Sequence, residues 1–235
     1  MAKGKSQKWL ESIAGAARIA GALVTPMLRA RRARWGATDA DLARVYPGDD
    51  LVPNPKWGWT HAVTLHARAA EAWPWVVQIG QGRGGFYSYE GLENLAGCDI
   101  HNADFVLPEF QDLAAGDSIR LHPEVPPLPI VLVERDRVIV IHALSDTSRG
   151  QPFEPADGVP ENYSNMTWVF FLNEQEGGTT RLISRTRYDY SPSFANKLMY
   201  GPVLLEPIGH VMDCRMLLGI KERVEAGSSR NPTEA

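Results

Sequence analysis

The stretch that decides the fold is the last long apolar segment, residues 191–227, which reads SPSFANKLMYGPVLLEPIGHVMDCRMLLGIKERVEAG. Its opening Ser-Pro pair is typical of a helix start, because the hydroxyl caps free N–H groups and proline is tolerated in the first turn. Gly227, which follows two basic residues, is typical of a helix end. We predict one long C-terminal helix, bent or interrupted at Gly201-Pro202 and at Pro207.

From Leu204 to Ile220 the predicted helix is apolar around most of its circumference, so it needs a large apolar partner. The middle of the chain can supply one. Alternating β-branched and aromatic residues predict a strand from Trp59 and two hairpins, at 129–144 and 166–190. Short helices are predicted at 38–46, 69–79 and 89–97.

The composition is that of an ordinary globular chain. Its 235 residues, 44% hydrophobic and 22% charged, suit one domain with appendages. A net charge of −4 argues against nucleic acid as a partner. Cys98 and Cys214 have the spacing of neither a disulfide framework nor a metal cluster, so we predict two buried thiols in a reducing, cytoplasmic compartment. We expect no metal and no cofactor.

Residues 1–35 form a basic arm that differs from the rest of the chain. Its apolar run is too interrupted for a membrane span or a signal peptide. On a helix, one side collects the apolar residues Trp9, Ile13, Ala20, Leu23, Val24 and Met27. For residues 9–28 three interpretations are open: packing on the same domain or a second copy, peripheral binding to an anionic membrane, or a frayed arm.

The remaining organisation follows from turn residues. Residues 36–58 are predicted to be a linker with a short helix, 59–226 the main domain, and 227–235 a disordered tail. The glycines at 80–85, GQGRGG, match the spacing of a dinucleotide-binding loop. No helical pattern follows them, so we interpret them as a mobile glycine turn.

The order of elements and the G-G-x-T-R-L turn and strand at 177–182 resemble the START/Bet v 1-like superfamily, also called SRPBCC, which includes polyketide cyclase/dehydrase-like proteins. The stretches at 73–104 and 198–223 resemble one bacterial branch of it. The resemblance covers about 59–226 and implies an α+β helix-grip fold, in which a curved antiparallel sheet wraps a long C-terminal helix around a cavity. Members bind lipids, sterols, polyketides or hormones, and a few catalyse cyclisation. The superfamily has no shared catalytic motif, so the resemblance implies no catalytic residue.

Candidate ligand-binding residues come from two kinds of pattern. Beside the glycine turn, aromatic hydroxyls, a carboxylate and an amide gather at Tyr87, Tyr89, Glu90 and Asn94. On the strands, Trp168 is a candidate pocket wall, and Arg185 a candidate partner for an acidic ligand group, because guanidinium binds carboxylates in bidentate fashion. The alternatives are a solvated helix face for the first group, core packing for the tryptophan and an outer sheet face for the arginine.

On the C-terminal helix, Glu206, His210 and Asp213 share one side. We name Glu206 and His210 as ligand-binding candidates; the alternative is a solvated strip. Our leading hypothesis is non-covalent binding of a hydrophobic small molecule between the sheet and this helix. One alternative is a cyclase/dehydratase-type enzyme that uses a pocket histidine or carboxylate as general base. Another is a membrane-associated or oligomeric accessory protein that acts through the N-terminal helix.

Overall fold

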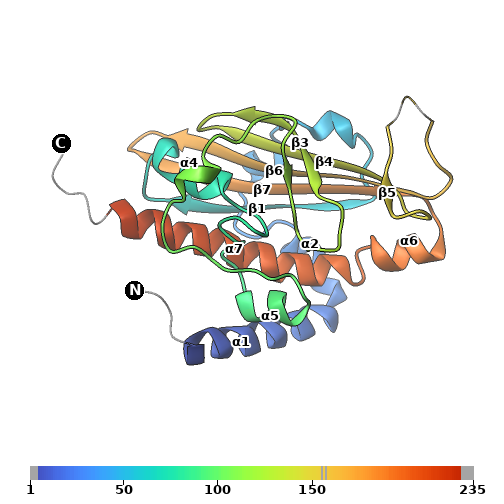
Figure 1. Cartoon of the computed structure of the whole chain (residues 1–235), viewed down its shortest axis with the longest axis horizontal. Helices are drawn as coiled ribbons and strands as arrows, with labels where there is room; N and C mark the ends of the chain where they lie inside the picture. The colour runs from blue at the N-terminus through green and yellow to red at the C-terminus, as the bar shows by residue number, and fades with distance from the viewer. Residues whose placement is uncertain (1–4, 155, 157, 229–235) are drawn as a thin grey trace.

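The structure is a computed structural model and describes residues 5–154, 156 and 158–228. A seven-stranded antiparallel sheet has helix α7 (Leu205–Ser228) along one of its faces (Figure 1). Helices α5 (Glu90–Leu95) and α1 (Lys5–Leu23) lie on the other side of α7. The curved sheet that grips a long C-terminal helix is an α+β helix-grip fold, which confirms the predicted fold class.

The sheet has the order β1-β7-β6-β4-β3-β2, with β5 paired to β4. Its long strands are β1 (Trp57–Leu65), β3 (Leu128–Glu134), β4 (Val138–Asp146), β6 (Tyr163–Gln175) and β7 (Thr179–Tyr190). The short strands are β2 (Ser118–Ile119) and β5 (Gln151–Pro152). Both predicted hairpins are confirmed, as β3–β4 and β6–β7. The second turns at Gly177 and Gly178, which both have the positive φ that glycine adopts without strain.

The inner face of the sheet packs on α7. Side chains alternate along a strand, so β1 directs His61, Val63 and Leu65 toward the helix. Val63 and Leu65 belong to one continuous apolar core that also includes Leu217 and Ile220 of α7. Three cavities within the described part of the chain lie on the opposite side of α7, against α1 and α5, and not in the predicted place between sheet and helix.

The outer face of the sheet is covered by the predicted linker. Tyr46, fully buried, packs there with Phe171 and Ile183. Ion pairs fasten the same segment, because Arg181 and Arg185 on β7 contact Asp41 and Asp49 at 2.6 and 2.7 Å. The short elements here are α3 (Asp39–Ala43), with Thr38 as its predicted cap, and η2 (Asp49–Leu51). Residues 36–56 are thus part of the domain's packing.

The C-terminal segment forms two helices. α6 (Phe194–Met199) begins after Ser193, whose Oγ accepts a hydrogen bond from Asn196 N at 3.2 Å, so the predicted start at Ser191 was two residues early. The helical segment is interrupted at Gly201-Pro202, as predicted. Pro207 lies in the first turn of α7, where a missing N–H leaves no hydrogen bond unmade. The disordered tail was predicted at 227–235, but residues 227 and 228 still belong to α7, and residues 229–235 lie outside the described part of the chain.

The remaining helices are α4 (Ala69–Val77), which confirms the predicted helix, α2 (Arg29–Arg32), η1 (Pro26–Leu28) and η3 (Pro108–Phe110). α1 packs on α5 and α7 through Gly15, Ile19 and Ala22. The apolar side that the sequence indicated remains exposed: Trp9 is 70% exposed and Val24 is 74% exposed. No described helix is long and apolar enough to cross a membrane.

Two glycines let α7 approach its neighbours closely. A Cβ at Gly209 would lie 2.5 Å from Trp59 Cη2, and one at Gly219 would lie 2.2 Å from the backbone oxygen of Tyr87. Both distances are far below van der Waals contact. Replacing Gly219 therefore forces α7 away from the segment that carries Tyr87.

We expect Gly219→Ala to lower the free energy of unfolding by about 1 to 3 kcal/mol, because the methyl group would overlap backbone atoms. Gly21 in α1 is the matched control, since a Cβ there meets nothing within 4 Å. Gly21→Ala should raise the free energy of unfolding by up to about 1 kcal/mol, the helix preference of alanine. Urea unfolding measures both, and equal effects would contradict the proposed close contact.

Candidate functional site

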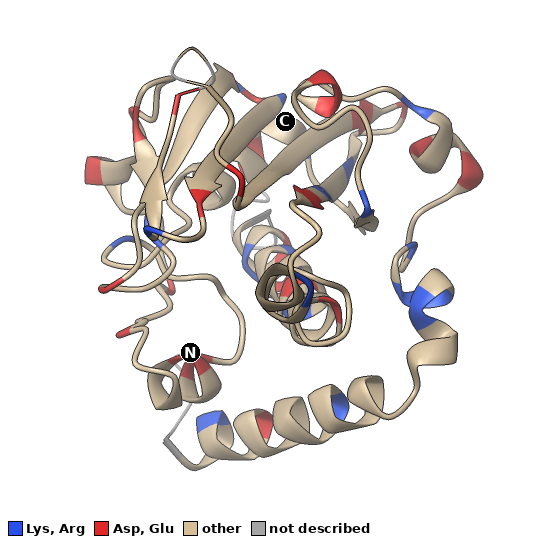
Figure 2. Cartoon of the chain, turned by 90° about the vertical axis from the view of Figure 1, so that its right-hand side faces the viewer, with Lys and Arg blue, Asp and Glu red and all other residues tan. Residues whose placement is uncertain are grey.

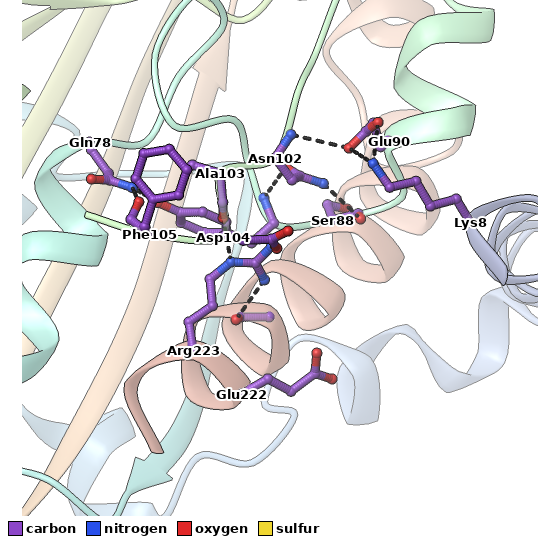
Figure 3. Close-up of polar contacts among 12 residues, drawn as sticks. Lys8, Gln78, Ser88, Glu90, Asn102, Ala103, Asp104, Phe105, Glu222 and Arg223 are labelled. Atoms are coloured by element: carbon purple, nitrogen blue, oxygen red, sulfur yellow. Dashed lines mark hydrogen bonds and ion pairs between the residues drawn. The ribbon is translucent and has the colours of Figure 1, made fainter. Parts of the chain in front are cut away.

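The largest of the three cavities, here called the main cavity, has a volume of about 560 Å³. It lies between the outer side of α7, the start of α1 and residues 87–90 and 102–106 (Figure 3). Its aromatic wall is made by Trp75, Tyr87, Tyr89 and Phe105. The cavity therefore brings together segments that lie far apart in the sequence.

Arg223 organises one end of the main cavity. Its Nε donates to the carbonyl oxygen of Ala103 at 2.8 Å, and its guanidinium lies 4.5 Å from the centre of the Tyr87 ring. The Tyr87 hydroxyl in turn accepts a hydrogen bond from Gln78 Nε2 at 2.8 Å. Burial raises the pKa of Tyr87, so its hydroxyl stays protonated and can also donate. Arg223 has a lowered pKa, mainly because it is buried.

Glu90 organises the other end. Its carboxylate accepts from Lys8 Nζ at 2.9 Å and from the backbone N of Asn102 at 3.1 Å. Asn102 Oδ1 accepts a hydrogen bond from Tyr87 N at 2.6 Å, and Asn102 Nδ2 donates to the backbone carbonyl oxygen of Ser88 at 3.4 Å. Glu90 thus ties α1 to the loop that carries Asn102, as the dashed lines in Figure 3 indicate.

Of the residues predicted from the sequence, Tyr87, Tyr89 and Glu90 line the main cavity together. Asn94 lines a second space, of about 520 Å³, between α1 and α5. Its amide also closes the loop after α5, since it donates to the Ile100 oxygen at 2.8 Å and accepts from Ile100 N at 2.5 Å.

The two predicted strand residues lie elsewhere. Arg185 is on the outer face of the sheet, where it pairs with Asp49 and donates to Thr60 Oγ1 at 2.6 Å. The sheet layer separates it from α7 and from the three cavities. Trp168 is on the inner face, and its indole N–H donates to Ser184 Oγ at 2.9 Å. Neither lines any of the three cavities.

Of the remaining two, His210 lines the third cavity, of about 450 Å³, which we call the histidine cavity, and Glu206 does not. Glu206 is 1% exposed and accepts hydrogen bonds from Arg32 Nε and Nη2, at 2.9 and 2.7 Å. His210 lines the cavity with Cys214, Trp35 and Arg18. Glu206 is therefore occupied by an ion pair, whereas His210 faces open space.

Behind His210 lies a buried polar network that was not predicted from the sequence. His61 on β1 lies with Nδ1 2.6 Å from Asp213 Oδ2, and Ser184 Oγ donates to Asp213 Oδ1 at 2.7 Å. His61 Nε2 lies 3.2 Å from His210 Nδ1, which is 3.5 Å from Cys214 Sγ. The sequence did contain a signal, because His61 is a polar residue between Trp59 and Val63, at a position where the alternation of the strand predicts an inward-facing side chain.

The environment sets the protonation of this network. Burial, with the nearby charges of His61 and Arg32, lowers the pKa of His210 to about 4. Burial and Asp213 raise the pKa of the Cys214 thiol well above its usual range. In the chain by itself, His210 is therefore neutral near pH 7 and Cys214 is a thiol. The prediction of two buried thiols is wrong, because Cys98 and Cys214 are both half-buried. Folding also places Cys214 beside His61 and His210, which its sequence spacing did not indicate.

No protein-family model matches this chain, and no curated protein matches its sequence. Solved structures resemble it in fold. An aromatase/cyclase from Streptomyces sp. R1128 has 12% sequence identity and a TM-score of 0.33, over 76% of this chain and 99% of that one. The Polyketide_cyc-like protein Cgl2372 from Corynebacterium glutamicum has 13% identity and a TM-score of 0.35, over 76% and 97%.

Protein Ms6760 from Mycobacterium smegmatis has 12% identity and a TM-score of 0.36, over 76% of this chain and 93% of that one. The likeness concerns the fold alone. The helix-grip assignment itself rests on the strand order and on α7 of this chain.

One buried carboxyl beside the main cavity gives a pH test of the site's packing. Glu93 of α5 is 8% exposed, and its Oε2 has no hydrogen-bond partner among the described residues. Burial, with the charge of Glu90, raises its pKa to about 7. Glu93 also helps to raise the pKa of Cys98.

Because the folded chain holds the Glu93 proton more tightly than the unfolded chain, the free energy of unfolding should fall as pH rises from 4.5 through about 7. Glu93→Gln should remove this decline and stabilise the protein at pH 8 by on the order of 3 kcal/mol. Urea unfolding at several pH values measures it. The exposed Glu109→Gln is the control, and parallel pH profiles for all three proteins would contradict the burial of Glu93.

Proposed function

We propose that this chain binds a small amphipathic molecule non-covalently in the main cavity. The observation that supports this is the cavity itself. Its volume of about 560 Å³ lies within the range of roughly 300 to 1,000 Å³ that is typical of ligand sites. Trp75, Tyr87 and Phe105 offer ring faces, and Ser88 and Asn102 offer hydrogen-bonding groups beside them.

The charges of the cavity argue for a ligand without a full charge. Each of its three cations already has a carboxylate partner: Lys8 with Glu90 at 2.9 Å, Arg223 with Asp104 at 3.4 Å, and Arg215 with Glu222 at 3.1 Å. An ionic ligand would have to break one of these pairs and leave a charge behind. An apolar body with hydroxyl or carbonyl groups fits better, as in lipids and polyketides.

The cyclase/dehydratase alternative has less support. His210, its predicted general base, lines the histidine cavity and not the main cavity. A histidine whose pKa is lowered to about 4 is a weak base near neutral pH. Glu90, the other candidate, is held by Lys8 and Asn102. Binding without chemistry is therefore the function that we propose.

Filling the cavity tests this proposal. Ala226 lines the main cavity from an exposed turn of α7, so Ala226→Trp should occupy the space without disturbing the core. We expect wild type to bind one N-phenyl-1-naphthylamine, an uncharged apolar dye, with native mass spectrometry giving the stoichiometry and dye fluorescence the affinity. In Ala226→Trp the affinity should fall at least about tenfold, a loss of about 1.4 kcal/mol of binding energy.

The control for this experiment is Ala40→Trp, which adds the same side chain to an exposed position of α3 on the opposite side of the molecule. It should bind the dye as wild type does. Unchanged dye affinity in Ala226→Trp would overturn the proposal, because the dye would then sit outside the main cavity. No dye binding by wild type would overturn it as well.

A second candidate function is favoured by the exposed side of α1. We propose that this side docks on an anionic membrane surface. α1 runs along one edge of the molecule (Figure 2), and Trp9, Leu10 and Ile13 are 70%, 67% and 48% exposed. Val24 and Met27 continue the row, and exposed Arg29 and Arg31 follow it. Such a row flanked by cations is complementary to anionic lipid headgroups.

Vesicle sedimentation tests the membrane proposal. Wild type should pellet with phosphatidylserine-containing vesicles, and less so at high salt, because salt screens the headgroup charge. The double variant Trp9→Ser/Val24→Ser should bind at least about tenfold more weakly, since each large apolar side chain contributes roughly 1.5 to 3 kcal/mol when fully buried. Val45→Ser, 83% exposed elsewhere, is the control. Equal pelleting of both forms, or self-association in place of pelleting, would overturn the proposal.

A further inference from the structure

Three side chains with metal-binding atoms meet beside the histidine cavity, which His210 and Cys214 line and behind which His61 is buried. His61 comes from β1, and His210 and Cys214 are one turn apart on α7. One ligand atom of each lies within 4.8 Å of the other two. Two imidazoles and a thiol form a donor set that suits zinc and related divalent ions.

The distances match those of a tetrahedral site. His61 Nε2 and His210 Nδ1 are 3.2 Å apart, and His210 Nδ1 and Cys214 Sγ are 3.5 Å apart. Bonds of about 2.05 Å to nitrogen and about 2.3 Å to sulfur, at tetrahedral angles, put two nitrogens about 3.3 Å apart and nitrogen and sulfur about 3.6 Å apart. Two of the three separations thus match a common ion, and the third, between His61 Nε2 and Cys214 Sγ, lies within 4.8 Å, so a side-chain adjustment of Cys214 can complete the site.

The surroundings of His61 resemble those of a metal-ligating histidine. Its Nδ1 faces the Asp213 carboxylate at 2.6 Å, and Asp213 is itself held by Ser184 at 2.7 Å. A carboxylate on the far nitrogen fixes the tautomer and presents the other nitrogen as the ligand. The Trp59 ring stacks on His61 at 5.3 Å between centroids, which also holds the imidazole plane.

His61 Nε2 has a backbone acceptor beside it. It lies 3.0 Å from the Arg32 carbonyl oxygen and 3.2 Å from His210 Nδ1. When Nε2 carries no proton, its lone pair and the carbonyl oxygen repel each other, and a cation bound to Nε2 removes that repulsion. The position between Nε2, His210 Nδ1 and Cys214 Sγ is therefore electrostatically suited to an ion.

The charges nearby allow a divalent ion. The Arg32 guanidinium would oppose one, but Glu206 neutralises it with two hydrogen bonds, at 2.9 and 2.7 Å. Asp213 and a Cys214 thiolate would together balance two positive charges. The histidine cavity, of about 450 Å³, gives an ion access and leaves room for a further ligand such as water.

We propose that His61 Nε2, His210 Nδ1 and Cys214 Sγ bind a divalent ion of the zinc class, with a fourth position open to the histidine cavity. Binding replaces the S–H bond of Cys214 with a sulfur–metal bond, and the thiol proton leaves to solvent, while each imidazole binds through the lone pair of the named nitrogen. The site is separate from the main cavity and does not depend on the function proposed for it.

Cobalt(II) is the probe for this site, because its spectrum reports thiolate ligation and tetrahedral geometry. Full-length protein, stripped with a chelator, should take up one equivalent of Co²⁺ with a thiolate charge-transfer band and strong visible bands. Zn²⁺ should remove both. Weak visible bands without charge transfer would overturn the proposal.

Variants locate the ion. Cys214→Ser should abolish the charge-transfer band, and His210→Ala should weaken Co²⁺ binding by more than about tenfold, a loss typical even of an indirect contact. Cys98→Ser and the exposed His66→Ala are the controls and should bind as wild type does. An unchanged spectrum in Cys214→Ser would overturn the proposal. Ala226→Trp should keep the cobalt spectrum, which separates this test from that of the main cavity.

X-ray absorption of the wild-type zinc complex needs no variant and covers the case in which a variant fails to fold. We expect one sulfur at about 2.3 Å and nitrogen or oxygen at about 2.0 to 2.1 Å. A shell with no sulfur would overturn the proposal.

Discussion

The contact between α7 and the inner face of the sheet is the interaction on which the rest of the structure depends. The helix is apolar around most of its circumference, so one covered side does not suffice. The sheet buries Leu217 and Ile220, and α1 and α5 cover Val211 and Met212 on the other side. Gly209 and Gly219 allow the close approach on which this double cover rests.

The double cover decides where empty space is found. Between sheet and α7, large side chains such as Phe170, Leu182 and Met216 form a continuous core. On the other side, the cover consists of the single helices α1 and α5 and of loops, and α1 and α5 contact α7 only along part of its length. The cavities with Tyr87, Arg223 and His210 therefore lie between helices. The arm that precedes the domain thus becomes one wall of the candidate sites.

Buried polar groups impose a second constraint on how α7 packs against the sheet. His61, Asp213 and Ser184 are all buried at the sheet–helix contact, and each satisfies another across it. Burying such groups costs free energy unless they are paired, so they fix the register between β1, β7 and α7. The same fixed register aligns His61 with His210 and Cys214. The structural network and the proposed ion site thus share one residue, His61.

Much of the fold could be predicted from local patterns. The alternation in both hairpins, the Gly-Pro break at 201–202 and the Thr38 cap depend on residues near one another in the chain, and each is confirmed. The amphipathic pattern of the arm did not decide which of its sides packs on the domain. Trp9 and Val24 of the apolar side are exposed, and the small residues Gly15 and Ala22 make the contact, because they permit a closer approach.

The candidate site could be predicted only in part. Tyr87, Tyr89 and Glu90 are neighbours in sequence, and the chain keeps them together at the main cavity. Arg185 lies on the outer face of the sheet, and Trp168 lies on the inner face of the neighbouring strand. Composition alone cannot tell a cavity wall from an ion pair or a packed core. Their partners, Asp49 and Ser184, decide the matter.

The sequence by itself determined the elements, their order and the demand of α7 for a large apolar cover, because periodicity and turn chemistry act over a few residues. Only the tertiary structure decided which side of α7 keeps open space and which side chains meet there. His61 and Asp213 are 152 residues apart in the chain. No local pattern brings them together, since their contact follows from strand register and from the depth at which α7 packs.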